Sequence, residues 1–349
     1  VPMKNKKNFF VSFGTKYGNY YKKFKVNDKI YEMPSGIAHF LEHKLFETKE
    51  ENPFDFYAKS GTDVNAGTSI FYTWYYFSGN NNYSDNLKYL LKFVTNLEIT
   101  DELVEKEKGI IIQESRMVSD NPNRILYDKT RENAFFIDPY KYKVIGSEEE
   151  IKSITKKDLE ICYDAFYRPD NMFIIAVGNI DKDKTIEVVK EELKNIKNKK
   201  EKVENIYYDE PDEVNISYEE IKLETSTTRL SFGYKINKKS LKLDEYKSQI
   251  YLGMLLTLAF GSTSLYREKC EQENLFTELS TNLLSSHSHF LLGVTAITSK
   301  KEKLVESLKK YFNNLKFSKE DFERIKKVWI ANEIKSIDNI SATSNDILT

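Results

Sequence analysis

The order of secondary-structure elements predicted from the first half of the chain recurs in the second half, and this restricts the fold more than any other feature. In the first half we expect strands at 8–14, 65–78 and 172–177 and helices at 36–47, 84–97, 101–118, 155–167 and 181–196. In the second half we expect strands at 217–223, 229–236 and 290–298, helices at 243–260 and 265–272, and two further helices. A charged segment at 194–204 lies between the halves and is interpreted as a solvated linker. The sequence therefore predicts an α+β protein of two similar units that mix sheets and helices.

We place the boundary of these units between residues 205 and 206. The first domain, 1–205, is expected to carry the functional site, and the second, 206–349, is expected to be cut short at its C-terminus. The chain begins at Val1 and enters strand-like sequence within a few residues, so we also expect a missing N-terminal piece.

Composition excludes several classes of protein. The 349 residues are 40% hydrophobic and 31% charged, which allows large cores and excludes wholesale disorder. The 53 Lys and Arg residues and 54 Asp and Glu residues give a net charge of −1, so we expect neither nucleic acid nor an anionic membrane as a partner. The most apolar stretch, 251–260, is about half of the roughly 20 residues that a membrane-spanning helix needs. Two cysteines, Cys162 and Cys270, are interpreted as small core residues, and their number favours a reducing, cytoplasmic location.

One short pattern carries chemistry. His39, Glu42 and His43 spell HxxEH within the helix predicted at 36–47, for which Ser35 is the expected N-cap. Residues four apart on a helix differ by about 40° in azimuth, so both imidazoles project side by side and can bind one metal ion. Glu42 lies beside them as a carboxylate that can act as a base. The alternative is that both histidines only fill or cap a helix surface.

A third ligand is missing from this pair, because catalytic zinc takes three protein ligands and leaves the fourth position to water. The helix predicted at 101–118 offers Glu105, Glu107 and Glu114. Glu107 and Glu114 are seven residues apart on one half-apolar face, where a carboxylate needs a partner such as a metal or a histidine N–H. Glu105 belongs to a wet surface. The alternative for Glu107 and Glu114 is a solvated helix with ion pairs between neighbouring turns.

Three segments resemble one family of enzymes. GIAHFLEH at 36–43, EKGIIIQE at 107–114 and the segment 145–181 resemble the inverzincin metallopeptidases of the pitrilysin, insulysin and mitochondrial processing peptidase family. The similarity covers roughly residues 8–200 and is faint beyond Tyr207.

The resemblance implies one Zn²⁺ per chain, held by His39, His43 and Glu114. It implies that Glu42 is the general base and that Glu107 supports a ligand imidazole from outside the coordination shell.

It further implies that an extended peptide substrate adds as a strand beside VNAGTS, residues 64–69, where Asn65 and Ala66 meet its backbone. Gly67 departs from the bulkier residue that is common in the family. For Asn65 the alternative is a turn residue.

A second departure concerns the second domain, in which the family usually carries an Arg and a Tyr, seven apart, that grip the substrate. Cys270 and Thr277 stand at these positions, and the nearby Tyr266 and Arg267 are interpreted as helix surface. The remaining two histidines, 287 and 289, alternate along a predicted strand and are interpreted as structural or surface residues.

These observations predict a zinc endopeptidase for extended or unfolded peptides, such as leader peptides. Because the gripping pair is missing, we expect a second, similar subunit, in a heterodimer or a homodimer. The alternative is a non-catalytic peptide-binding or scaffold subunit of a heteromeric peptidase.

Overall fold

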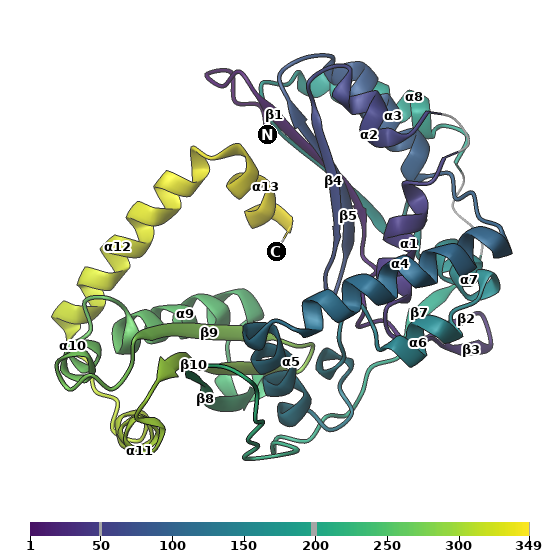
Figure 1. The fold of residues 1–349 in the computed structure, drawn as a ribbon. Coiled ribbons are helices and arrows are strands. Elements are labelled where there is room, and N and C mark those ends of the chain that lie inside the picture. The colour runs from purple at the N-terminus through teal and green to yellow at the C-terminus, as the bar shows by residue number, and fades with distance from the viewer. Residues whose placement is uncertain (49–50, 197–200, 349) are drawn as a thin grey trace. The chain divides into compact units, whose positions relative to one another are not determined.

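The computed structural model describes residues 1–48, 51–196 and 201–348, which form two compact units (Figure 1). The first unit comprises Val1–Met117, Tyr142–Tyr207 and Lys335–Thr349, and the second comprises Val118–Lys141 and Tyr208–Ile334. Each unit combines antiparallel sheet with helices, so the chain is an α+β protein, as predicted.

The first unit is built on a four-stranded antiparallel sheet. Its strands, in spatial order, are β4 (Asp63–Thr68), β5 (Thr73–Gly79), β1 (Phe9–Thr15) and β6 (Met172–Gly178). The central strand β1 is rich in phenylalanine and is buried along its whole length, because it pairs with β5 on one side and β6 on the other. It forms the middle of the larger hydrophobic core.

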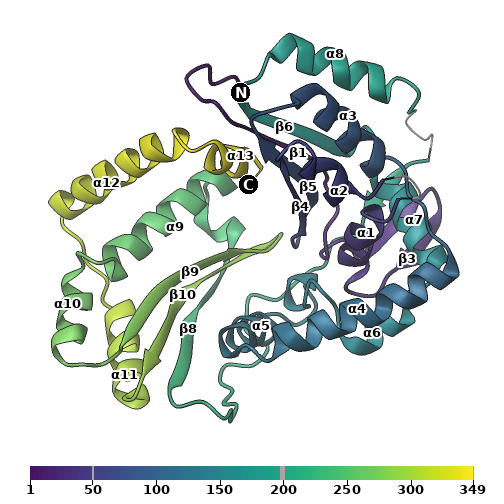
Figure 2. The same cartoon turned by 45° about the horizontal axis from the view of Figure 1, so that its top comes forward.

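Helices cover both faces of this sheet. The elements packed near it are α1 (Ile37–Leu45), α3 (Tyr83–Val94), α7 (Lys156–Phe166), α8 (Lys182–Leu193) and α13 (Ile340–Leu348). Figures 1 and 2 show α13 on the opposite face from α3 and α8. The remaining elements of this unit are α2 (Pro53–Ala58), α4 (Asp101–Ser119), α6 (Glu148–Ser153) and a small sheet of β2 (Lys23–Val26), β3 (Lys29–Glu32) and β7 (Val203–Asn205).

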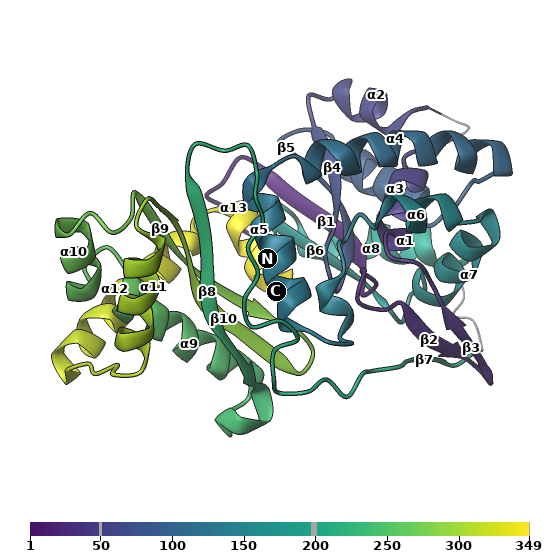
Figure 3. The same ribbon diagram turned by 60° about the horizontal axis from the view of Figure 1, so that its bottom comes forward.

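The second unit contains a three-stranded antiparallel sheet (Figure 3). Its strands, in spatial order, are β8 (Thr228–Asn237), β10 (His289–Thr298) and β9 (Glu278–Ser285). The helical elements are α5 (Pro122–Ala134), η1 (Pro139–Lys141), η2 (Lys238–Leu241), α9 (Glu245–Phe260), α10 (Leu265–Gln272), α11 (Lys301–Phe312) and α12 (Lys319–Ile337), whose last turn passes into the first unit. Helix α9 packs on β9 and β10, and α11 on β8, around a smaller core.

Each unit contains a helix from the opposite half of the chain. Helix α5 follows α4 in sequence but packs on β8 of the second unit, whereas α13 follows α12 and packs on β1 and β6 of the first. The domain boundary expected between residues 205 and 206 stays a prediction. Because of the packing of α5 and α13, the compact second unit includes residues 118–141 and the compact first unit includes residues 335–349.

Several expected elements differ in the structure. The strand expected at 65–78 is a hairpin of β4 and β5, and 217–223 forms no strand because its backbone pairs with no neighbouring strand. Helices α2 and α5 and strand β9 were not predicted. The expected linker at 194–204 lies partly outside the described residues and ends in β7. Cys162 and Cys270 are buried in the two cores, as predicted. None of the described helices is both long and apolar enough to cross a membrane.

Candidate metal centre

Helix α1 begins at Ile37, directly after Gly36, a position whose backbone conformation and close neighbours require glycine. Gly36 has φ +90°, and a Cβ atom there would lie 2.4 Å from the carbonyl oxygen of Ile145. The predicted N-cap, Ser35, is wrong: Gly36 occupies that position. The Ser35 hydroxyl accepts from Lys22 Nζ at 2.7 Å and its N–H donates to Glu150 Oε1 at 2.9 Å, so neither group caps the helix.

The structure brings together the three residues expected as metal ligands. His39 and His43 lie on α1 and Glu114 lies on α4, and one ligand atom from each falls within 4.8 Å of the others. His39 Nε2 is 3.7 Å from Glu114 Oε1, and His43 Nε2 is 3.5 Å from Glu114 Oε2. The two histidine rings are 4.6 Å apart, as the four-residue spacing predicts. All three side chains are partly buried, so part of the cluster is accessible to solvent.

Glu107 lies next to this cluster and contacts His43, the second of the two histidines. It is 5% exposed, and His43 Nδ1 lies 2.9 Å from its Oε1. Burial alone would raise the pKa of Glu107, but the hydrogen bond and charge of His43 lower it. Glu105, by contrast, is exposed and pairs with Lys108, as expected for a wet surface.

The two imidazoles have opposite electrostatic environments. Burial, and then the charge of His43, lower the pKa of His39 to about 4, so His39 is neutral at pH 7. Burial alone would lower the pKa of His43 as well, but hydrogen bonds to Glu107 and Glu114 raise it to about 9. His39 Nδ1 is buried without a hydrogen-bond partner among the described residues.

Glu42 lies beside the cluster and is oriented by a neighbouring strand. Thr68 Oγ1, at the end of β4, donates to Glu42 Oε2 at 2.5 Å. Burial raises the pKa of Glu42, an effect that the Thr68 hydrogen bond only partly offsets. A partly buried carboxylate with a raised pKa next to two histidines is suited to accept and return a proton.

Strand β4, which carries Asn65 and Ala66, lies at one edge of its sheet. It pairs with β5 on one side and with no strand of the described chain on the other, so its outer backbone groups can pair with an extended peptide. Asn65 lies within the strand and not in a turn, and its Oδ1 accepts from the N–H of Ala66 at 2.8 Å. A Cβ at Gly67 would lie 2.7 Å from the ring of Trp74 on β5, so that ring fills the space of the bulkier residue.

Sequence reasoning missed Thr68 and Lys44. Thr68 lies two residues after Ala66, and period two in a strand places both on one face. Lys44 follows His43 and occupies the buried stripe of α1 with Ile37 and Leu41. A lysine on an apolar helix stripe is a signal that the spacing alone could have revealed.

The second unit holds the other residues that the sequence singled out. Cys270 is buried in α10, and Thr277 lies between α10 and β9. Tyr266 and Arg267 are not simple helix surface: Tyr266 stacks on Tyr311 at 3.9 Å, and Arg267 donates to the carbonyl oxygen of Leu279.

The two remaining histidines also belong to the second unit. His289 opens β10 and is 1% exposed, with Nε2 3.0 Å from Asp212 Oδ1, so it has a structural role. His287 lies between β9 and β10 and not in a strand.

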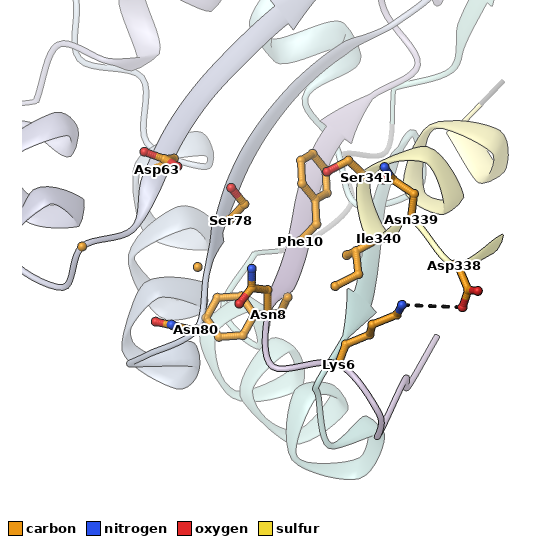
Figure 4. A pocket seen from close by; sticks show the side chains of 13 residues that line it. Lys6, Asn8, Phe10, Asp63, Ser78, Asn80, Asp338, Asn339, Ile340 and Ser341 are labelled. Carbon is orange, nitrogen blue, oxygen red and sulfur yellow. Dashed lines mark ion pairs between the residues drawn. The ribbon is translucent and has the colours of Figure 1, made fainter. Parts of the chain in front are cut away.

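A cavity of about 490 Å³ lies elsewhere in the first unit, beside β1, β4, β5 and α13 (Figure 4). Lys6 and Asp338 form an ion pair at its wall, with Nζ 3.5 Å from Oδ1. None of the residues that line this cavity belongs to the histidine and glutamate cluster.

Comparisons with known proteins place both halves of the chain in one group. The family described as insulinase (peptidase family M16) matches residues 30–148, and the one described as peptidase M16 inactive domain matches residues 153–328. The similarity therefore extends well beyond Tyr207, where it had looked faint.

Individual relatives agree with this grouping. The uncharacterized zinc protease YmfH of Bacillus subtilis (strain 168) is 32% identical over 325 residues, which cover 88% of this chain and 73% of that protein. The beta subunit of the mitochondrial-processing peptidase of Bos taurus is 29% identical over 167 residues, 46% of this chain and 34% of that protein. In fold, a putative M16-like peptidase from Alicyclobacillus acidocaldarius matches with a TM-score of 0.93 and 30% identity, over 99% of this chain and 83% of that one.

Sequence and fold therefore define an M16-type protein over both halves of the chain, the first half matching the insulinase family and the second the inactive domain. The chain belongs to peptidase family M16, the insulinase family, which confirms the resemblance noted in the sequence.

Proposed function

We propose that the chain is a zinc-dependent endopeptidase whose ion is held by His39, His43 and Glu114. The observation that carries this proposal is the convergence of three donor atoms within 4.8 Å beside the partly buried carboxylate of Glu42. Ligand atoms about 2.0–2.2 Å from a tetrahedral zinc ion lie roughly 3.4 Å apart, close to the 3.5 and 3.7 Å that separate the imidazole nitrogens from Glu114. The donor set of two imidazoles and one carboxylate also suits zinc.

When bound, zinc would lower the pKa of a coordinated water molecule and polarise the scissile carbonyl group. Glu42, held by Thr68, takes the proton from the attacking water and returns it to the leaving amine. Glu107 accepts from His43 Nδ1–H, so Nε2 is the nitrogen that would give its lone pair to the ion, in place of the proton that the raised pKa of His43 otherwise keeps there.

An extended or unfolded peptide is the substrate that this site favours. The open edge of β4 lies on a strand that packs on α1, so a peptide that pairs with Asn65 and Ala66 runs past the ligand helix. Main-chain pairing gives affinity with little side-chain selectivity, which suits leader peptides and other unfolded segments. A second, similar subunit is proposed to supply the gripping Arg and Tyr that Cys270 and Thr277 replace. The match to a processing-peptidase subunit supports this pairing.

Metal content and peptide cleavage test the proposal together. The wild-type chain is expected to bind about one zinc per chain, and His43→Ala is expected to lose it. Glu42→Gln is expected to keep the zinc while losing roughly 10²- to 10⁴-fold in hydrolysis of an unfolded peptide, because only the base is removed. Zinc binding without cleavage by the wild type, alone or with a similar subunit, would instead favour a non-catalytic peptide-binding subunit. Metal content unchanged in His43→Ala would overturn the ligand assignment.

A further inference from the structure

Lys44 is a buried charged residue immediately after the HxxEH pattern. Its side chain is 0% exposed, and among the fully buried side chains of the described residues it is one of the largest. A buried ammonium group is stable only when its N–H donors are paired. Its partners therefore indicate what the residue does.

Two hydrogen-bond acceptors and one further carboxylate oxygen surround the ammonium group of Lys44. The Glu47 carboxylate lies on the same segment and forms an ion pair with it. The carbonyl oxygen of Leu103, in the first turn of α4, accepts at 3.2 Å. Glu107 Oε2, one turn further along α4, lies 3.9 Å away. Lys44 thus joins α1, which carries two ligand histidines, to α4, which carries Glu114.

The two oxygens of Glu107 are divided between Lys44 and a ligand. Oε2 faces the Lys44 ammonium, and Oε1 lies 2.9 Å from His43 Nδ1. An Oε1 that accepts from Nδ1–H fixes the tautomer in which Nε2 carries the lone pair. A carboxylate held at one oxygen by a buried ammonium cannot turn away from the imidazole without separating that ion pair.

We propose that Lys44 is a positioning residue of the metal centre, which acts through Glu107 to hold His43 Nε2 toward the ion. This inference rests on the proposed function of His39, His43 and Glu114 as zinc ligands. It adds to that proposal a buried link that runs from the Leu103 carbonyl through Lys44 and Glu107 to His43.

The test compares zinc affinity, by chelator competition, in the wild type and in Lys44→Met, which keeps the length of the side chain and removes the ammonium. Affinity is expected to fall about 10- to 100-fold, the usual effect of losing support for a ligand from outside the coordination shell. The absorption spectrum of the Co²⁺-substituted protein is expected to change as well, because the geometry around His43 loosens. Glu107→Gln is expected to have a similar effect, and the double variant little more than either single one, since both act on one link.

Lys108→Met is the matched control. Lys108 lies on α4 next to Glu107 but donates to the exposed carboxylate of Glu105 and not to Glu107, so its loss is expected to leave affinity unchanged. If Lys44→Met does not fold, Lys44→Met/Glu47→Gln removes one charge of each sign, and its zinc affinity is expected to show the same loss. Wild-type affinity and an unchanged Co²⁺ spectrum in either Lys44 variant would overturn the positioning role. Failure of the wild type itself to bind zinc would overturn the proposed function instead.

Discussion

At the scale of single residues, uncharged hydroxyl groups orient the carboxylate of Glu42, the proposed general base. Glu42 is partly buried, and of its two oxygens Oε2 accepts from the Thr68 hydroxyl at 2.5 Å. Thr68 Oγ1 is in turn 3.4 Å from the hydroxyl of Thr73 on β5, which donates to the carbonyl of Tyr17. The strand hairpin therefore orients a carboxylate that belongs to a helix.

We expect Thr68→Val to lower kcat for peptide hydrolysis about 10- to 100-fold, because a hydrogen bond to a charged group contributes roughly 1.5–3 kcal/mol. Zinc content and KM are expected to stay near the wild-type values, since the substitution removes only a hydroxyl that contacts Glu42 and leaves the backbone of β4 in place. Steady-state kinetics and metal analysis measure these quantities. Thr95→Val, which removes a hydroxyl at the end of α3, is the control. A kcat that Thr68→Val leaves unchanged would show that Glu42 needs no such support.

A second residue-scale feature is the buried ion pair of Glu210 and Lys235 in the second unit. Their side chains are 0% and 1% exposed, and Glu210 also accepts from the backbone N–H groups of 136–138. Burial alone would raise the pKa of Glu210, but Lys235 and these N–H groups lower it.

Glu210→Gln is expected to lower the free energy of unfolding by about 3–5 kcal/mol, because Lys235 would remain buried without its counter-charge. A carboxylate with a lowered pKa stabilises the fold above its unfolded value of about 4.3, and the stabilisation disappears as pH falls through the folded value. The difference between wild type and variant is therefore expected to shrink below about pH 4. Urea unfolding at several pH values measures it, with Glu302→Gln as an exposed control. Equal stability of the two proteins at pH 7 would contradict the argument.

At the scale of elements, the β4–β5 hairpin fills the space left by Gly67, which stands where a bulkier residue is common in the family, with a side chain from the neighbouring strand. Gly67 pairs with Trp74 across the hairpin, and the indole ring covers the glycine. The Trp74 side chain of β5 thus fills the space beside Gly67 on β4, the strand that packs on α1.

This arrangement predicts coupling between the two positions. Gly67→Val is expected to destabilise the chain by about 1–3 kcal/mol in the wild type, because the new side chain overlaps the indole ring. In the Trp74→Ala background the same change is expected to cost much less, which gives a coupling energy of about 0.5–3 kcal/mol. A double-mutant cycle from urea unfolding measures this energy. Additive effects would mean that Trp74 does not fill the space at Gly67.

Local spacing predicts an element well when its own residues determine it. Helices α1 and α4 lie close to their expected bounds because apolar and charged residues alternate at helical spacing. That spacing also paired His39 with His43 and Glu107 with Glu114, whereas the choice of Glu114 as third ligand came from the family resemblance. The break between β4 and β5 was missed because the turn at 69–72 has no glycine or proline. It is instead closed by Ser69, whose N–H and hydroxyl donate to the carbonyl oxygen of Tyr72.

At the scale of the whole molecule, the exchange of α5 and α13 between the halves could not be predicted from local spacing. Both helices begin after a short turn that follows a long helix, and nothing in either pattern states which sheet the helix covers. Contacts distant in sequence determine this: α13 packs on β1 and β6, and α5 on β8.

A chain that ends at Asp338 lacks α13 and is expected to lose about 1–3 kcal/mol of local stability in the first unit. Amide hydrogen exchange is expected to speed up in β1 and β6, whose face α13 covers. Strands β8 to β10 of the second unit serve as the control within the same molecule, and their protection is expected to stay unchanged. Uniform loss of protection across both sheets would show that α13 supports the whole chain and not one unit.

The position of α13 in the sequence has a consequence for synthesis in the cell. Strand β6 completes the first sheet at Gly178, but the helix that covers one face of that sheet is translated more than 150 residues later. At about 5–20 residues per second, a ribosome needs roughly 10–30 s for that interval. During this time the nascent chain carries the proposed ligand residues and the open edge of β4 on a sheet with one uncovered face. Because the uncovered face exposes the sheet to aggregation, we expect a ribosome-bound chaperone to protect the chain most during this interval.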